Sequence, residues 1–257
     1  MNSKYLNLTI TIVILFLGFS NKAFATPVSA TLDFHAEAIL SEFDGSTETS
    51  HVIDSQTDSW GTLLDPLNVS VSANASDPDQ FITVSGNASA SWGSGGNSGN
   101  VLFQNFGFSG DAHNYTADLR NGSDDNIWSY TFIADSDGFF SMTYDVSVVD
   151  AIGTFGSFGL RGWDIQWSGA GSGLSLMDAF DPTANGVFLR PVVAGQFYTV
   201  GLNGGPSVAS GSSLNEEFSK HVQGNFNFAI SPVPEPSMIV LLLVGLMALS
   251  IFYRKWI

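Results

Sequence analysis

Residues 140–149 read Phe-Ser-Met-Thr-Tyr-Asp-Val-Ser-Val-Val, and this stretch decides the fold class. Apolar side chains occupy the even positions, whereas the odd positions are small and mostly polar. Strict alternation of this kind is typical of a β-strand that buries one face and exposes the other. The pattern recurs at 82–92 and 128–134. We expect further strands at 31–40, 69–75, 101–108, 159–167, 187–193, 197–202 and 226–230.

Turn-forming residues separate these strands. Gly, Asn, Asp and Pro dominate segments such as 77–79, 121–126, 135–138 and 203–206, where they supply positive φ or a preset bend. The Gly-, Ser- and Asn-rich stretch at 94–100 reads as a hairpin loop. About ten short strands without a fixed-period repeat favour an all-β, antiparallel β-sandwich or jelly-roll-like body over a propeller or solenoid.

The composition excludes several classes of function. The chain has 257 residues, of which 44% are apolar, a net charge of −16 and no cysteine. Without cysteine it has no disulfides, cysteine zinc sites, iron–sulfur clusters or thiol nucleophile. Its eight basic residues are spread along the chain, so no basic face is available for nucleic acid.

The N-terminal 25 residues have the three zones of an export signal. Lys4 precedes an apolar run at 8–19, and the small residues Ala23 and Ala25 then match the −3 and −1 positions of a signal peptidase site. We therefore expect residues 1–25 to be a signal peptide and the mature chain to begin at Thr26. The alternative is an uncleaved membrane anchor, although the run is short for a membrane span.

The C-terminus, residues 233–257, has a different organisation. Pro234, Glu235 and Pro236 precede an apolar segment at 238–253, and Arg254 and Lys255 follow it. We expect one transmembrane helix that begins at or after Pro236, because proline does not fit a helix interior. The basic pair should stay cytoplasmic, which places residues 26–232, the exported domain, outside.

This combination of features resembles the PEP-CTERM sorting signal of Gram-negative bacteria. The resemblance covers residues 233–257 and rests on Pro234-Glu235-Pro236, a single apolar segment and a basic end. It implies recognition by a membrane-embedded exosortase, cleavage near the Pro-Glu-Pro motif, and association with exopolysaccharide and biofilm material. Residues 133–167 and 194–200 also resemble the bodies that precede such tails, which favours a β-sandwich. The alternative is a permanent single-pass anchor with a proline-rich stem.

Two ligands are candidates for the exported body. Residues 26–233 hold four basic against 23 acidic residues, a net charge of −19 that attracts divalent cations. Asp135 and Asp137, in an Asp-Ser-Asp-Gly turn, and the pair Asp124 and Asp125 supply the oxygen donors that calcium prefers. The alternative is that these residues serve the turns alone, since Asp and Gly favour turns for conformational reasons.

Carbohydrate is the second candidate ligand. Trp163 and Trp167 are four residues apart, so both face the same side of a strand and together can stack on a sugar. The alternative is that these aromatic rings fill the core, which is their usual place.

The sequence contains no motif that indicates catalysis. The four histidines lack metal-ligand spacing, no Gly-x-Ser-x-Gly elbow is present, and no pair of carboxylates is marked out. We therefore expect a non-enzymatic protein of the cell surface or extracellular matrix, with a structural or adhesive role in exopolysaccharide. A secreted carbohydrate- or calcium-binding module is one alternative, and a surface hydrolase is another.

Overall fold

The computed structural model describes residues 24–41, 47–120, 126–152, 161–168, 174–175, 184–205, 207–233 and 245. Within them the chain is all-β, as the alternating patterns predict. The elements are β1 (Ala25–Ser41), β2 (Glu48–Ser59), β3 (Leu67–Ser76), β4 (Phe81–Trp92), a short 3₁₀ turn η1 (Ser94–Gly96), β5 (Ser98–Arg120), β6 (Trp128–Ala134), β7 (Gly138–Ile152), β8 (Arg161–Trp167), β9 (Leu174–Ser175), β10 (Ala184–Val192), β11 (Phe197–Gly205) and β12 (Ser207–Pro232).

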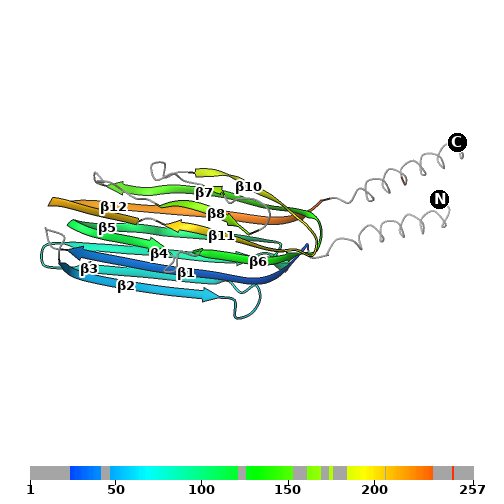
Figure 1. The fold of residues 1–257 in the computed structure, drawn as a ribbon, viewed down its shortest axis with the longest axis horizontal. Helices are drawn as coiled ribbons and strands as arrows, with labels where there is room; N and C mark the ends of the chain where they lie inside the picture. The colour runs from blue at the N-terminus through cyan, green and yellow to red at the C-terminus, as the bar shows by residue number, and fades with distance from the viewer. Residues whose placement is uncertain are drawn as a thin grey trace, which may run out of the picture.

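All strand pairs are antiparallel, and they join into one nearly closed sheet (Figure 1). The main path runs β10-β7-β12-β5-β1-β6-β11-β8-β9, with β2 beside β1 and the β3–β4 hairpin beside β5. β5 changes partner along its length: residues 99–111 pair with β4, and residues 115–120 pair with β1. β5 therefore joins the β3–β4 hairpin to β1 within the one sheet.

The sheet is not closed by backbone hydrogen bonds between β2 and β3. Among the described strands, β2 pairs with β1 and β3 with β4. Side chains of β2 instead accept backbone N–H groups of β3 in antiparallel register. The three bonds join Asp58 to Asn68 at 2.8 Å, Gln56 to Ser70 at 3.4 Å and Asp54 to Ser72 at 2.8 Å. We call this line of contacts the seam; it satisfies β3 donors that would otherwise be left to water.

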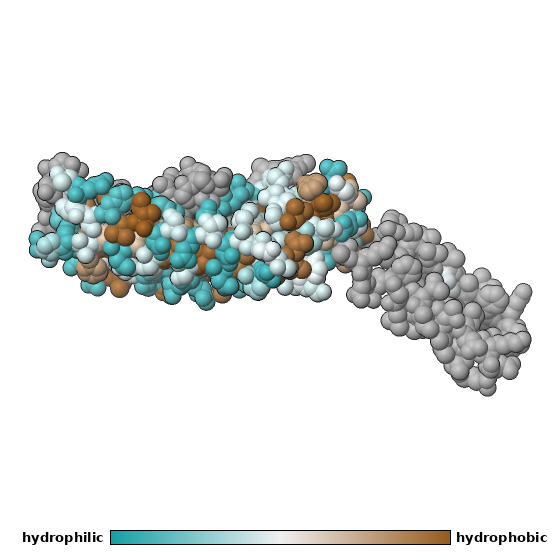
Figure 2. Space-filling view, turned by 90° about the horizontal axis from the view of Figure 1, so that it is seen from below, coloured by the Kyte–Doolittle hydropathy of each residue, from teal (hydrophilic) through white to brown (hydrophobic). Residues whose placement is uncertain are grey.

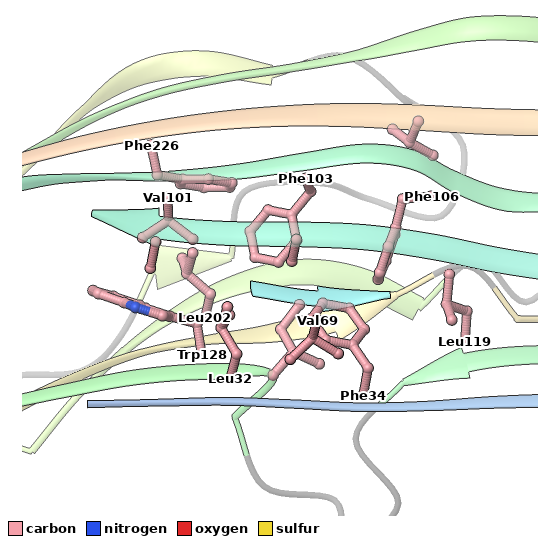
Figure 3. Close-up of a cluster of buried hydrophobic side chains, with 14 of the residues drawn as sticks. Leu32, Phe34, Val69, Val101, Phe103, Phe106, Leu119, Trp128, Leu202 and Phe226 are labelled. Carbon is pink, nitrogen blue, oxygen red and sulfur yellow. The ribbon is translucent and has the colours of Figure 1, made fainter. Parts of the chain in front are cut away.

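The core is one continuous cluster of buried side chains, rich in aromatic rings, on the inner face of the sheet (Figure 3). Phe34 of β1 meets Phe103 and Phe106 of β5 at ring-centroid distances of 5.9 and 5.3 Å. Phe226 of β12 meets Phe103 edge to face at 5.7 Å. Each of these four rings is at most 1% exposed, so burying them contributes a large part of the hydrophobic stabilisation.

The observed strands differ from the predicted ones chiefly by the presence of β2 and by the greater length of β1, β5 and β12. The strand predicted at 128–134 is β6, and the 94–100 stretch does connect the β4–β5 hairpin. However, β2 was not predicted, and only the last part of β12 was. β2 has no buried residue, so it lacks the alternation that identifies a half-buried strand. Across the described residues, we find no helix with the length and apolar character needed to cross a bilayer.

Candidate functional site

The two candidate calcium ligands in the Asp-Ser-Asp-Gly turn lie between β6 and β7, at one end of the sheet. Both carboxylate oxygens of Asp135 lie 3.1 Å from the Thr26 hydroxyl, which donates to them. Oδ1 of Asp137 accepts the backbone N–H of Ala194 at 2.8 Å. Both carboxylates therefore accept hydrogen bonds from the protein itself, from Thr26 at the start of β1 and from Ala194 in the β10–β11 turn.

The backbone of this turn ties down both ends of the described body. The N–H of Asp135 donates to the carbonyl of Phe24 at 3.0 Å, just before β1. The N–H of Val233, just after β12, donates to the carbonyl of Asp137 at 2.9 Å. The first and last described residues of the sheet are thus held by a single turn.

Asn97 holds the same two ends from the β4–β5 loop. Its Oδ1 accepts the N–H of Phe24 at 3.1 Å and that of Ala25 at 2.9 Å. Its carbonyl accepts the N–H of Ile230 in β12 at 2.7 Å. We call Asn97, Asp135 and Asp137 the terminal clasp.

The loop that carries Asn97 is itself fixed from the core. The hydroxyl of Tyr130 donates to the carbonyl of Gly96 at 2.7 Å, and burial raises the pKa of this phenol, which keeps it protonated as a donor. Gly96 has φ +72°, and a Cβ at this position would lie 2.3 Å from Pro27 Cγ. Only glycine suits this position, where the loop presses against the start of β1.

The predicted signal cleavage site has a distinctive structural setting. Ala25 is completely buried and pairs with Ala134 of β6, so the Ala25–Thr26 bond lies inside the sheet. A protease needs an extended, accessible chain, and cleavage here must therefore precede the pairing of β1 with β6. Cleavage after Ala25 stays a prediction, and Ala23 lies outside the described residues.

The other predicted site residues are only partly described. Trp167 is 8% exposed and stacks on Tyr198 at a ring-centroid distance of 5.2 Å. This ring therefore belongs to the core, which was the alternative to sugar binding. Trp163 lies in β8, but its side chain is not among those described. The remaining predicted residues lie outside the described part of the chain: Asp124, Asp125, Pro234, Glu235, Pro236, Arg254 and Lys255.

A cluster of serine, aspartate and histidine was not predicted. On the outer face, Ser219 Oγ donates to Asp150 Oδ2 at 2.8 Å, and His221 Nδ1 lies 2.9 Å from Asp150 Oδ1. Burial alone would raise the pKa of Asp150, but hydrogen bonds from Ser219 and His221 lower it below its ordinary value. Ser219 Oγ also lies 3.3 Å from His221 Nδ1, so serine and aspartate share the same ring nitrogen, whereas a nucleophilic triad places them on opposite nitrogens of the histidine. Only the β7–β12 register brings these residues together, so the sequence carried no signal for the cluster.

A shallow groove of about 400 Å³ crosses the outer face of β3, β4 and β5. Carboxamides and hydroxyls line it together with a few apolar side chains, and none of its residues is charged. The lining residues are Gln56, Asn68, Val69, Ser70, Asn87, Ala88, Ser89, Leu102 and Gln104. Outward positions of β3 from 68 to 76 hold only Asn and Ser, and the seam carboxylates of Asp54 and Asp58 border this neutral strip.

Two further results bear on the candidate sites. Among the described residues, no three acidic or histidine side chains gather closely enough to form a metal-binding group. Comparisons of the chain with protein-family models, curated proteins and solved structures find no match.

Proposed function

We propose that this protein is an exported cell-surface or extracellular-matrix protein, sorted through its PEP-CTERM-like tail, with a structural or adhesive role in exopolysaccharide or biofilm material. Its body is a β-sandwich-like or jelly-roll-like domain. The partners are signal peptidase at Ala25 and an exosortase-type enzyme at Pro234-Glu235-Pro236. The precursor is anchored in the inner membrane, and the product reaches the cell surface or the medium.

The terminal clasp is the observation that carries this proposal. Thr26, the expected first residue of the mature chain, and Val233 both bind the turn at 135–137, so the two ends of the exported body lie at the same end of the sheet. Figure 1 shows the start of β1 and the end of β12 side by side there. The 15-residue β7 runs from this end over about 50 Å, at about 3.3 Å per residue. A body tethered at one end presents its far end and both walls to surrounding material, as a matrix or adhesive role requires.

A three-alanine replacement of Pro234-Glu235-Pro236 in the native host tests the proposal. We expect the variant to accumulate in the membrane fraction as uncleaved precursor, whereas the parent chain is shortened and found at the surface or in the medium. Glu217→Ala, an exposed acidic residue far from the tail, is the control and should be processed normally. Normal processing and release of the three-alanine variant would refute sorting through this motif.

Carbohydrate binding is a second candidate, favoured by the neutral groove. Carboxamide and hydroxyl groups pair well with sugar hydroxyls, and the half-buried Leu102 offers contact to sugar-ring C–H groups. Asn68 lies in the groove, and Asn74 lies on the same face of β3 outside it, so Asn74→Ala is the control for Asn68→Ala. We expect Asn68→Ala to weaken retention on the host's own neutral polysaccharide several-fold and Asn74→Ala to leave it unchanged. Equal retention by both variants would remove the groove as the binding site.

A further inference from the structure

Four exposed apolar side chains surround the end of the body that carries the terminal clasp. Phe139 is 42% exposed, Val193 54%, Phe197 63% and Val233 42%. They come from the start of β7, the β10–β11 turn, the start of β11 and the residue after β12. We call these four residues the apolar rim.

The strand register places the rim residues at the same end. Phe139 pairs with Ser231, close to the end of β12, and Val233 donates to the carbonyl of Asp137. Phe197 pairs with Ile133, which in turn pairs with Thr26 at the start of β1. Figure 2 shows hydrophobic residues on the surface at this end, one of several such groups on the face that it displays.

The sequence leaves little chain between the rim and the apolar tail segment. Only residues 234–237 separate Val233 from the segment at 238–253. At about 3.3–3.6 Å per residue they span at most roughly 15–18 Å. The polar zone of a bilayer is about 5–8 Å thick on each side, so a tail anchored in the hydrocarbon keeps the rim at or near the headgroups.

The charge near the rim limits the lipid that it can meet. The carboxylates of Asp135 and Asp137 lie in the same turn and are hydrogen-bonded to Thr26 and Ala194. An acidic, apolar surface is repelled by anionic lipids but can insert its aromatic and aliphatic groups among zwitterionic headgroups. Zwitterionic lipid is therefore the matching partner.

We propose that the apolar rim docks on the surface of a zwitterionic bilayer while the tail is anchored, so that the body stands on the membrane by its clasp end. This inference rests on the proposed function, because the tail brings the rim to the lipid. It adds a direct contact between the folded body and the headgroups, beyond attachment through the tail alone.

Site-specific fluorescence quenching tests the contact, and the absence of cysteine from the chain makes labelling specific. Phe197→Cys and, as a second rim position, Phe139→Cys carry a fluorophore in the full chain, reconstituted in phosphatidylcholine vesicles with nitroxide-labelled headgroups in both leaflets. Val149→Cys is the control, since Val149 is 57% exposed in the last part of β7, away from the rim. We expect several-fold stronger quenching at either rim position than at the control.

A longer stem separates docking from simple proximity. With about 20 Gly and Ser residues inserted after Val233, a docked rim keeps its quenching, whereas a merely tethered body loses it. Loss of rim quenching in the long-stem chain, or equal quenching at rim and control positions in the parent, would overturn the inference while leaving membrane anchoring intact. Failure of the chain to remain with the vesicles after alkaline washing would overturn the proposed anchoring as well as the inference.

Discussion

Replacing Asn97 with alanine should destabilise a chain that retains Phe24 and Ala25 but hardly affect a chain that begins at Thr26. The Asn97 side chain accepts two hydrogen bonds, and both donors are backbone N–H groups of residues that the predicted signal cleavage removes. The variant therefore tests whether the hydrogen bonds of the Asn97 side chain stabilise only the precursor, which still contains Phe24 and Ala25.

The structure sets the size of this effect. Ala25 is completely buried, so its orphaned N–H would lose a hydrogen bond without gaining water, at a cost of about 1–3 kcal/mol. The N–H of Phe24 is only partly buried and contributes about 0.5–1.5 kcal/mol. The sum is about 3 kcal/mol, which for a domain of roughly 200 residues corresponds to a fall in Tm of about 6–12 °C.

Thermal unfolding followed by circular dichroism measures the difference. Asn97→Ala is compared with its parent in two backgrounds, one beginning at Phe24 behind an initiator methionine and one beginning at Thr26. Asn74→Ala serves as an exposed-asparagine control in both. Equal losses of Tm in the two backgrounds would refute the reasoning, because the effect would then not depend on the Phe24 and Ala25 donors.

Three other predictions follow from the fold. Because its hydrogen bonds lower the pKa of Asp150, they add stability above the unfolded carboxyl pKa of about 3.9 that is lost as pH falls through the folded pKa; Asp150→Asn should therefore flatten the acid limb of an unfolding-against-pH curve, and an unchanged limb would contradict this. Asp54→Ala in the seam should lower the free energy of unfolding in urea by about 0.5–1.5 kcal/mol, and an equal loss for Asp145→Ala, an exposed control on β7, would argue against the seam. Calcium should leave Tm unchanged relative to chelator because the Asp137 carboxylate already serves Ala194; a rise that Asp137→Asn abolishes would restore the calcium alternative.

The sequence predicted strand segments in which apolar and polar residues alternate clearly. The alternation at 140–149 lies in β7, where Phe140 and Met142 are fully buried, and that at 128–134 is β6. Alternating apolar residues arise because one side of a sheet is buried, so this pattern was enough to predict the all-β fold class. It said nothing of β2, which is held by its backbone ladder with β1 and by polar side chains along the seam, and has no buried residue to mark one face.

The candidate site could be predicted only in part. Asp135 and Asp137 stood out because an Asp-Ser-Asp-Gly turn is visible in the sequence, but their partners Thr26 and Ala194 are 109 and 57 residues away. Asn97 gave no signal, since a Gly- and Ser-rich loop looks the same whether or not its asparagine holds a distant strand. Strand order decides such contacts, and a single sequence does not fix strand order.

The position of β12 determines how the body responds to force. This last strand pairs with β5 from residue 207 to 229 and, on its other side, with β7 from residue 219 to 232, so its C-terminal half is held on both sides. A pull on the tail, with the far end of the body held by surrounding material, acts along the strand axis and perpendicular to the hydrogen bonds. Both ladders are then loaded in shear, so many bonds share the tension at once instead of opening one after another. The strand that ends closest to the proposed tail is therefore also the one whose C-terminal half is hydrogen-bonded on both edges.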